Sequence, residues 1–554
     1  MNIRRRDIHV LILYVAFGVA AYSNVINAFF LSDDFEFIGR MLEGGLPFMW
    51  GQEHGGFFRP VLILSFYFDT LLWGARPFGF HLTSLVLHAL NAFLVFLLTR
   101  VLLQTARLEA AEQPPEQQRR RRRRRRACVA FLAGLIFLLH PSHTEAVSWV
   151  SGRADLLASF FFLLSLFFCV AHAREAKRGA LLISLASFSL ALLSKESAAC
   201  LPLVVFAVAV YLDKGERRAV RLKRSLMKAA PYFVLLVVYV AARAAVLGAL
   251  VGGYGAAQHL NFTHSVVATQ LLRFSLRAAL PAFVLRGLPF LESRALSPVL
   301  IVSGTLAVLT AAVLLRRAAT RAALSALARR HTFLWLMALL FVCALLPVIN
   351  LRINVFDTQG ERFLYLPSAF YAPGAAYLCA CTQEGRRAAL RTAALACLLI
   401  FYAGSLWATN RDWSAASRLS QSIIEELAAQ STRDAVLLLN APDNLRGAYV
   451  YRNGLGRALL SFQHAKPISR AQVLAWHNLH TPLDQIELTG EAGTYTLRPL
   501  NTATKFERAG ATPDCARDFS LSAEALRVRL EACAGTFDVF YFSEGRMHRA
   551  WPPP

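Results

Sequence analysis

Charged residues are scarce in this sequence, and acidic residues are the scarcer kind. Only 17% of the 554 residues are Asp, Glu, Lys or Arg, and 35 acidic residues stand against 59 basic ones. Hydrophobic residues make up 56% of the chain, and the mean hydropathy is +0.43. This composition excludes an ordinary soluble protein. Repeated apolar runs of roughly 20 residues instead predict a polytopic α-helical membrane protein.

The sequence also has no cysteine pattern that is typical of a metal site. The nine cysteines show no spacing typical of metal ligands, and seven of them lie in or beside apolar runs. A cysteine in such a run behaves as a small hydrophobic residue. The other two, Cys515 and Cys533, lie in a polar tail, and they would form a disulfide if that tail is outside the cytoplasm.

A strong basic excess raises the question of nucleic-acid binding. The net charge is +24, and residues 119–126 are an uninterrupted arginine run. That run lies between two apolar segments, however, and charge beside apolar segments orients membrane helices. We therefore expect a cytoplasmic loop close to anionic membrane lipids, and no nucleic-acid partner.

The order of basic loops predicts the membrane topology. About eleven spans, starting from a cytoplasmic N-terminus, put every arginine-rich short loop on one side. They include a span that starts at about Pro231, a span over about residues 298–315, and two short spans within residues 180–212 that are separated by a break at residues 194–197. Residues 57–73, which include Asp69, are instead expected to form a helix along the outer membrane surface. Residues 1–409 would form this transmembrane domain. From residue 410 the composition becomes mixed, which predicts a small soluble α/β domain over residues 410–554 on the extracytoplasmic side. Within it, strands are expected over residues 434–440, 494–500 and 536–542.

Polar residues of both signs collect beside the spans on the predicted outer side. Asp33 and Asp34 directly follow the first apolar run. Charges next to hydrocarbon are unfavourable unless they pair or line a wet cavity. For each residue alone, a salt bridge at a helix end is the simpler explanation, but the whole set favours an active site. Its other members are Arg59, His140, His143, Glu145, Arg153, Asp155, Lys195, Glu196, Glu361 and Arg362.

A divalent metal is a further hypothesis, although the sequence demands no cofactor. Asp33 and Asp34 are adjacent, so their side chains diverge and do not readily chelate one ion. Asp34 together with Glu145 or Asp155 would supply the carboxylate oxygens that Mg²⁺ or Mn²⁺ binds.

Several short segments between residues 32 and 413 occur in an order that is typical of one protein family. They are Asp33-Asp34, residues 59–74, 77–82, 88–91, 140–147 with 152–155, 194–197, 361–368 and 410–413. Together they resemble the transmembrane and TPR repeat-containing O-mannosyltransferases, and the acidic pair resembles the motif of the wider GT-C superfamily of membrane glycosyltransferases. The tail after Trp413 departs from that family, because it shows no 34-residue periodicity.

The resemblance implies a GT-C core that uses a polyprenyl-phosphate-linked sugar and a hydroxyl acceptor on a protein, lipid or glycan. We expect transfer with inversion on the extracytoplasmic side, with Asp33 or Asp34 as the general base. The donor phosphate would be bound by Arg59, His143, Arg153, Lys195 and Arg362. Orientation of these cations, or binding of the sugar, is assigned to His140, Glu145, Asp155, Glu196 and Glu361.

Three alternatives stay open at this point: a transporter of lipid-linked or polar solutes, a noncatalytic assembly protein, and an en-bloc oligosaccharide transferase. A transporter would be expected to show an internal repeat of spans, and none is visible in the sequence.

Arginine abundance and the lack of TPR repeats favour a bacterial cytoplasmic membrane with a periplasmic C-terminal domain, with the endoplasmic reticulum as the alternative. The sugar, the acceptor and the oligomeric state are not given by the sequence.

Overall fold

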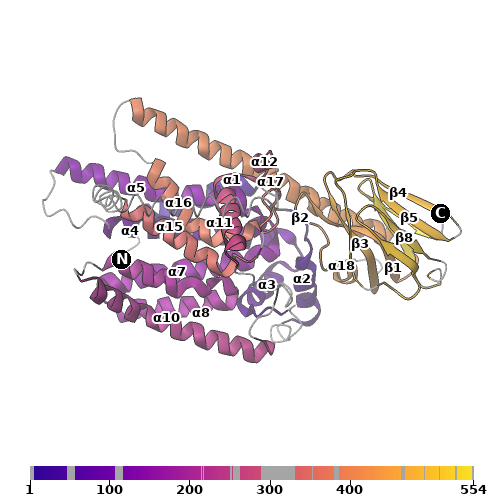
Figure 1. The fold of residues 1–554 in the computed structure, drawn as a ribbon, viewed down its shortest axis with the longest axis horizontal. Helices are drawn as coiled ribbons and strands as arrows, with labels where there is room; N and C mark the ends of the chain where they lie inside the picture. Colours follow the sequence, from indigo (N-terminus) through magenta and orange to yellow (C-terminus); the bar gives the residue numbers. More distant parts are fainter. Residues whose placement is uncertain are drawn as a thin grey trace.

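The structure, a computed structural model, has a helical part and a β-rich part joined by one long helix (Figure 1). It describes residues 5–45, 56–105, 116–213, 217–249, 263–287, 331–351, 353–379, 386–462, 468–491, 493–510, 512–530 and 535–551, together with Gly215, Gly253 and Cys533.

Four of the described helices are long and apolar enough to cross a membrane: α4 (Pro77–Thr105), α7 (Arg153–Glu175), α10 (Arg218–Leu247) and α17 (Arg386–Gln430). Helix α5 (Glu116–Leu138) and the short helices over Pro141–Ser148 form a bent pair that would make a fifth span. These helices confirm the predicted helical membrane class. The predicted count of about eleven spans is not confirmed for the described residues.

Shorter helices complete the helical part. The shorter apolar ones are α3 (Pro60–Trp73), α8 (Arg178–Ser194), α9 (Leu201–Leu212) and α15 (Thr332–Leu345). The others are α1 (Arg5–Tyr22), α2 (Asp33–Gly44), α6 (Thr144–Ser148), α11 (His264–Ala279), α12 (Ala282–Leu285) and α16 (Tyr365–Cys379). Single 3₁₀ turns are η2 (Pro141–His143), η3 (Val150–Gly152), η4 (Glu196–Cys200), η6 (Leu346–Val348) and η7 (Glu361–Leu364).

Several helix boundaries differ from those expected from hydropathy. Helix α5 starts at Glu116, within the predicted cytoplasmic loop, and α10 starts at Arg218 rather than at Pro231. Both extensions are rich in arginine, which has a high helix propensity, so the helix continues where hydrophobicity stops. The predicted break after Ser194 is confirmed by the end of α8 there. The span expected over residues 298–315 lies outside the described residues.

The C-terminal part contains two sheets. The larger has the strand order β10-β9-β1-β3-β6, with β2 paired to β1, and the smaller has the order β4-β5-β8-β7. Strand β1 pairs in parallel with both β3 and β9, as expected for a mixed α/β unit. The strands are β1 (Ala435–Leu445), β2 (Ala448–Tyr449), β3 (Arg470–Leu479), β4 (Ile486–Glu491), β5 (Thr494–Pro499), β6 (Phe506–Arg508), β7 (Arg517–Leu521), β8 (Leu526–Arg529), β9 (Asp538–Ser543) and β10 (Arg546–Trp551). The three strands predicted from sequence correspond to β1, β5 and β9.

Helix α17 connects the two parts without interruption. The composition change at residue 410 lies inside this helix, so the junction is a rigid helix and not a flexible linker. Its C-terminal half packs on the larger sheet through Ile423 and Leu427, together with α18 (Leu455–Ser461). The opposite face of that sheet forms a second core with the smaller sheet. The β-rich part is therefore a helix–sheet–sheet sandwich.

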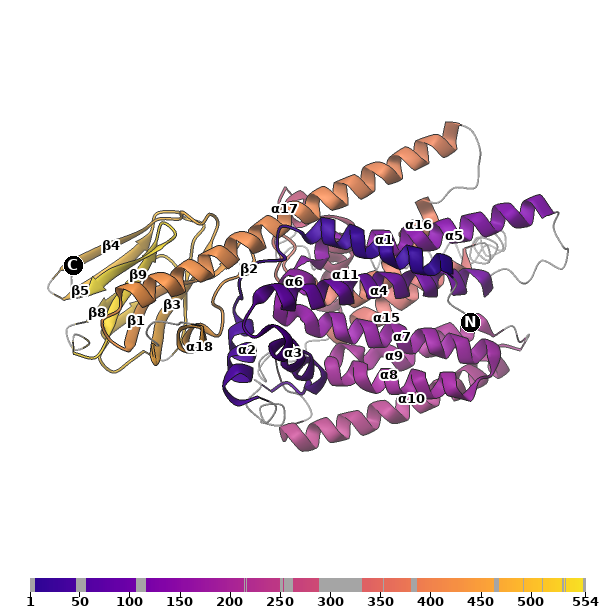
Figure 2. The same ribbon diagram turned by 180° about the vertical axis from the view of Figure 1, so that it is seen from behind.

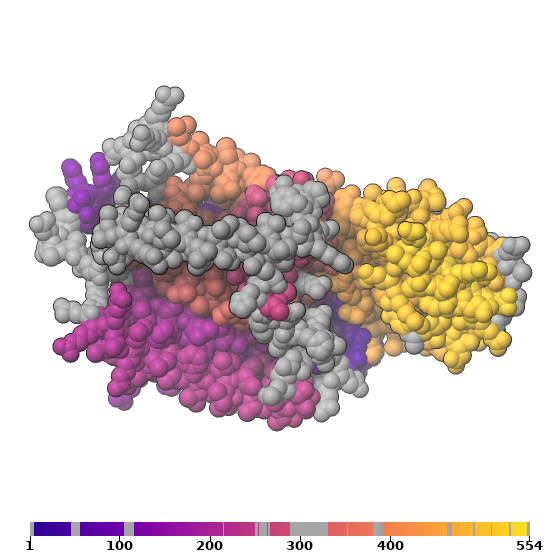
Figure 3. Space-filling view, in the orientation of Figure 1, coloured from indigo at the N-terminus to yellow at the C-terminus, as the bar shows by residue number. Residues whose placement is uncertain are grey.

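The ribbon views place two features of opposite charge at opposite ends of the helical part. The arginine-rich start of α5 lies at the end far from the β-rich part, whereas α2 and α3 lie beside it (Figures 1 and 2). The β-rich part projects as a lobe beyond that second end (Figure 3). The acidic residues at the start of α2 are thus close to the C-terminal domain and remote from the arginine run.

A disulfide joins Cys515 and Cys533 beside the second core, as the sequence analysis anticipated for a tail outside the cytoplasm. The two residues are 18 apart in sequence, and in the chain-entropy description a cross-link across such a loop stabilises the folded state by about 3 kcal/mol.

We expect the double substitution Cys515→Ser and Cys533→Ser to make the C-terminal domain more sensitive to limited proteolysis. Unchanged protease resistance in the double variant would contradict this contribution.

Candidate active site

The two acidic residues at the start of α2 have different environments. Asp34 is 1% exposed and receives three hydrogen bonds. Its Oδ2 accepts from the Leu31 backbone N–H at 3.0 Å, and its Oδ1 accepts from the Ser151 N–H at 2.7 Å and the Ser151 hydroxyl at 2.5 Å. Burial raises the pKa of Asp34 to about 7. Asp34 therefore fastens the start of α2 to the loop before α7.

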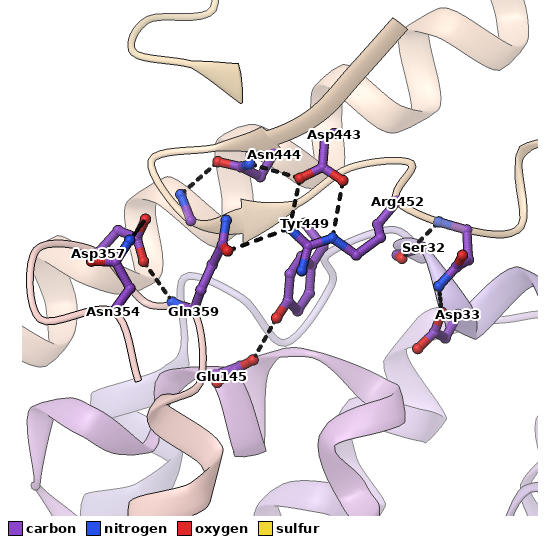
Figure 4. Close-up of polar contacts among 12 residues, drawn as sticks. Ser32, Asp33, Glu145, Asn354, Asp357, Gln359, Asp443, Asn444, Tyr449 and Arg452 are labelled. Atoms are coloured by element: carbon purple, nitrogen blue, oxygen red, sulfur yellow. Dashed lines mark hydrogen bonds and ion pairs between the residues drawn. The ribbon is translucent and has the colours of Figure 1, made fainter. Parts of the chain in front are cut away.

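Asp33 is half-buried and faces other groups. The Asn453 side-chain amide of the C-terminal domain donates to its Oδ1 at 2.7 Å (Figure 4). Burial raises the pKa of Asp33, and the hydrogen bond from Asn453 and the charges of Arg362, Arg452 and Arg59 oppose that rise. A raised pKa makes a carboxylate a stronger base, so Asp33 has the character expected of a general base.

Glu145 binds a guanidinium and a phenol together. Its carboxylate pairs with the Arg362 guanidinium and accepts from the Arg362 backbone N–H at 2.8 Å. It also accepts from the Tyr449 hydroxyl at 2.9 Å (Figure 4). The Arg362 guanidinium also donates to the Tyr449 oxygen at 3.0 Å and lies 5.3 Å from the Trp149 ring centroid. These contacts fix one cation where α6, η7 and β2 meet.

Two further ion pairs flank the break after α8. Lys195 Nζ lies 2.6 Å from an Asp155 oxygen, and both side chains are buried. The next residue, Glu196, makes a two-point contact with Arg59, at 2.6 Å and 3.2 Å. Lys195 Nζ also lies 5.3 Å from the ring centroid of Phe363. The sequence-predicted residues Arg59, Asp155, Lys195 and Glu196 are thus brought together beside the Arg362 segment.

The C-terminal domain completes this cluster with residues that the sequence analysis missed. Two residues between β1 and α18 contact the membrane part directly. Tyr449 points toward Glu145 (Figure 4), and Asn453 donates to Asp33. Arg452 makes a two-point contact with Asp443 at 2.7 Å and 3.0 Å and lies 4.6 Å from the Tyr449 ring centroid. The Ser32 N–H donates to the Val450 carbonyl at 2.9 Å. A loop within a soluble-looking tail has no hydropathy signal that marks it as part of a membrane site.

Four predicted site residues are instead buried and make ion pairs or hydrogen bonds with other buried groups of the protein. Arg153 is fully buried: it pairs with Asp69 at 2.6 Å and donates to Ser65, Ser84 and the Phe80 carbonyl. Glu361 pairs with buried Arg277. His140 lies 2.8 Å from the Ala278 carbonyl, and His143 lies 2.8 Å from the Ser368 hydroxyl. This geometry does not favour the phosphate or sugar contacts expected for Arg153, His140, His143 and Glu361.

The proposed metal ligands do not converge. Asp34 is bound by Leu31 and Ser151, Glu145 by Arg362 and Tyr449, and Asp155 by Lys195. Within the described ranges, no three His, Cys, Asp or Glu side chains lie close enough together to hold an ion. The carboxylates Asp34, Glu145 and Asp155 therefore do not fit a shared Mg²⁺ or Mn²⁺ site.

Known proteins resemble part of this chain. Over 198 residues it is 31% identical to the protein O-mannosyl-transferase Tmtc1 of Drosophila melanogaster, a match that covers 33% of this chain and 20% of the relative. It is 38% identical over 119 residues to Tmtc3 of the same fly, covering 22% and 13%. It is 33% identical over 171 residues to human TMTC2, covering 28% and 18%. Part of the chain is similar to protein O-mannosyl-transferases. The resemblance expected from its motifs is thereby confirmed.

These matches are partial. The chain spans about a fifth or less of the length of these relatives. No protein-family model matches the chain. Among solved structures, ArnT from Cupriavidus metallidurans bound to undecaprenyl phosphate is similar at 13% identity and a TM-score of 0.42, covering 93% of this chain and 97% of that one. At this score the likeness supports no conclusion about the present chain.

The different environments of the adjacent acidic residues predict different stability effects. Asp34→Ala leaves buried donors of Leu31 and Ser151 unsatisfied, which destabilises by about 2–3 kcal/mol. Asp33→Ala removes one bond from an exposed asparagine, so its effect on stability should be below about 1 kcal/mol. Thermal unfolding of both purified variants in the same detergent measures the difference. Equal losses for the two variants would show that Asp34 has no special structural role.

Proposed function

We propose that this protein is a GT-C-type membrane glycosyltransferase. It moves one sugar from a polyprenyl-phosphate-linked donor to a hydroxyl acceptor on the extracytoplasmic side, with inversion. The observation that carries this proposal is that the charges of Arg59 and Arg362 act on Asp33. The same two arginines act, together with Lys195, on neighbouring Asp155. Partial similarity to protein O-mannosyl-transferases supports the reaction class.

Asp33 is the proposed general base. It is less buried than Asp34, its pKa is raised by burial, and three arginine charges act on it. An acceptor hydroxyl beside Asp33 would lose its proton to this carboxylate as it attacks the anomeric carbon of the donor. The bond between that carbon and the phosphate oxygen breaks, and the polyprenyl phosphate leaves as an anion. Asp34 positions Asp33 and takes no part in proton transfer.

The cations near Asp33 would bind the lipid phosphate before and after transfer. Arg59 and Arg362 have side chains 13% and 14% exposed, so they are the accessible cations of the predicted set. Glu196 and Glu145 hold them in fixed orientations, and Asp155 does the same for Lys195. Oriented guanidinium groups stabilise a developing phosphate charge without reorganising during the reaction.

The C-terminal domain would form the other wall of the site. Tyr449 orients both Glu145 and Arg362, and Asn453 donates to Asp33. The disulfide in the same domain favours an oxidising compartment, which agrees with an extracytoplasmic location. The donor sugar and the acceptor are left open.

Radiolabelled polyprenyl-phosphate-linked mannose, incubated with the purified full chain and serine- or threonine-containing peptides, tests the proposal directly. We expect labelled product, and we expect Asp33→Asn to lower the rate about 10²- to 10³-fold because the base is lost. Asp518→Asn is the matched control, since Asp518 is an exposed acid on β7 with a positive φ that asparagine tolerates.

Normal turnover by Asp33→Asn would refute the assigned base. If the wild-type protein transfers no sugar from mannose-, glucose- or other polyprenyl-phosphate donors, but moves the intact lipid between leaflets, the transporter alternative replaces the present proposal.

The pH dependence of transfer tests the contact between the domains. A base works only when it is deprotonated, so kcat/KM should fall as the pH drops through the pKa of Asp33. The hydrogen bond from Asn453 lowers that pKa. Asn453→Ala should therefore move the acidic limb of the pH profile to higher pH. An unshifted limb would mean that Asp33 is not the titrating group or that Asn453 does not contact it.

A further inference from the structure

A polar cavity lies at the junction of the helical part and the C-terminal domain, and its lining includes no residue of the Asp33 cluster. It has a volume of about 800 Å³ and lies between α12, α17 and the end of β1. A neighbouring cavity of about 660 Å³ shares Arg286 and Arg446 with it, so the two cavities adjoin. We call the larger cavity the arginine groove, because its walls include Arg286, Arg411, Arg418 and Arg446.

The groove has an excess of positive charge. The larger cavity has these four arginines and one acidic residue, Asp412, in its lining. Backbone carbonyls hold two of the guanidinium groups in place. Arg286 donates to the Phe356 carbonyl at 2.7 Å, and Arg446 donates to the His480 carbonyl at 2.7 Å. Fixed guanidinium groups around a cavity favour an anionic ligand with several acceptor oxygens, such as a phosphate.

The backbone at one arginine is unusual. Arg446 has a left-handed backbone conformation with a φ of 51°, and the next residue, Gly447, has a φ of 92°. A non-glycine residue in this region is disfavoured and persists where the surroundings hold it. Here the contacts with His480 and Asp412 hold Arg446 so that it lines the groove.

Exposed aromatic residues line the same cavity. Trp407 is 44% exposed and Phe283 is 49% exposed. Trp407 lies near the middle of α17, the helix that runs from the helical part into the C-terminal domain. Tryptophan beside arginine at the end of a membrane helix is typical of the level of the lipid headgroups.

We propose that the arginine groove binds the phosphate of an anionic phospholipid from the adjacent leaflet. The aromatic side chains would contact the glycerol and upper acyl region, and the arginines would bind the phosphate oxygens. The proposal gives a role to the segment Asn410-Arg411-Asp412-Trp413. Its buried residues Asn410 and Trp413 anchor α17, with Asn410 accepting from Ser148 at 2.7 Å, whereas exposed Arg411 lines the groove.

Site-specific cross-linking tests this binding in the full chain. Phe283→p-benzoylphenylalanine puts a photoreactive group at the groove, and the purified protein is reconstituted with dioleoylphosphatidylglycerol or with dioleoylphosphatidylcholine. We expect a larger cross-linking yield with the anionic lipid. Each arginine beside an anionic headgroup is worth about 1 kcal/mol, or about fivefold in affinity. Arg411→Ala with Arg418→Ala should therefore weaken apparent affinity for phosphatidylglycerol about tenfold or more.

Two controls test whether the positive charge at these two positions, and not elsewhere on the protein, gives the lipid preference. Arg411→Lys with Arg418→Lys should retain most of the preference, and Arg498→Ala, an exposed arginine on β5, should leave it unchanged. Equal cross-linking of both lipids, or an unchanged preference in the double alanine variant, would overturn the proposal. Much stronger competition by polyprenyl phosphate than by phosphatidylglycerol would overturn the assignment to a phospholipid. These readouts involve no sugar transfer, so they are independent of the proposed enzyme activity.

Discussion

Pairing of charges at the ends of apolar helices is the constraint on which this structure depends. A lone carboxylate or guanidinium there is strongly unfavourable, so each needs a partner. Five of the ion pairs join segments far apart in sequence, and each of these five therefore also fixes the arrangement of the helices. The pairs are Asp69–Arg153, Glu145–Arg362, Asp155–Lys195, Glu196–Arg59 and Glu361–Arg277.

The pairs differ in how much of the cation is left accessible, and this difference separates scaffold from candidate site. Arg153 and Arg277 are fully enclosed and hold elements together. Arg59 and Arg362 are also paired, but they border half-buried Asp33. The same distinction applies to the adjacent acids, since Asp34 is saturated by backbone and hydroxyl donors. We therefore assign the proposed catalysis to Asp33, Arg59 and Arg362, because their partners orient these side chains and leave them partly exposed.

Sequence reasoning predicted the helical membrane class and three of the C-terminal strands, because hydropathy and its alternation are local signals. It also singled out Arg59, Asp155, Lys195 and Glu196, which the structure brings together, because charges beside apolar runs are unusual. It could not separate Asp33 from Asp34, since burial depends on the Ser151 loop more than 100 residues away. Nor could it recognise the enclosure of Arg153, because Asp69 belongs to a segment interpreted as a surface helix. Tyr449 and Asn453 were missed because their role comes from docking of the C-terminal domain, which no periodicity encodes.

A structure with a bound donor analogue tests the central claim most directly. A nonhydrolysable polyprenyl-phosphonate sugar, bound to the wild-type full chain, should have its phosphonate oxygens about 2.7–2.9 Å from guanidinium nitrogens of Arg59 or Arg362. The anomeric carbon should then face Asp33, with Tyr449 and Asn453 beside the bound donor. A donor bound elsewhere, with neither arginine in contact and Asp33 remote from the sugar, would contradict the account.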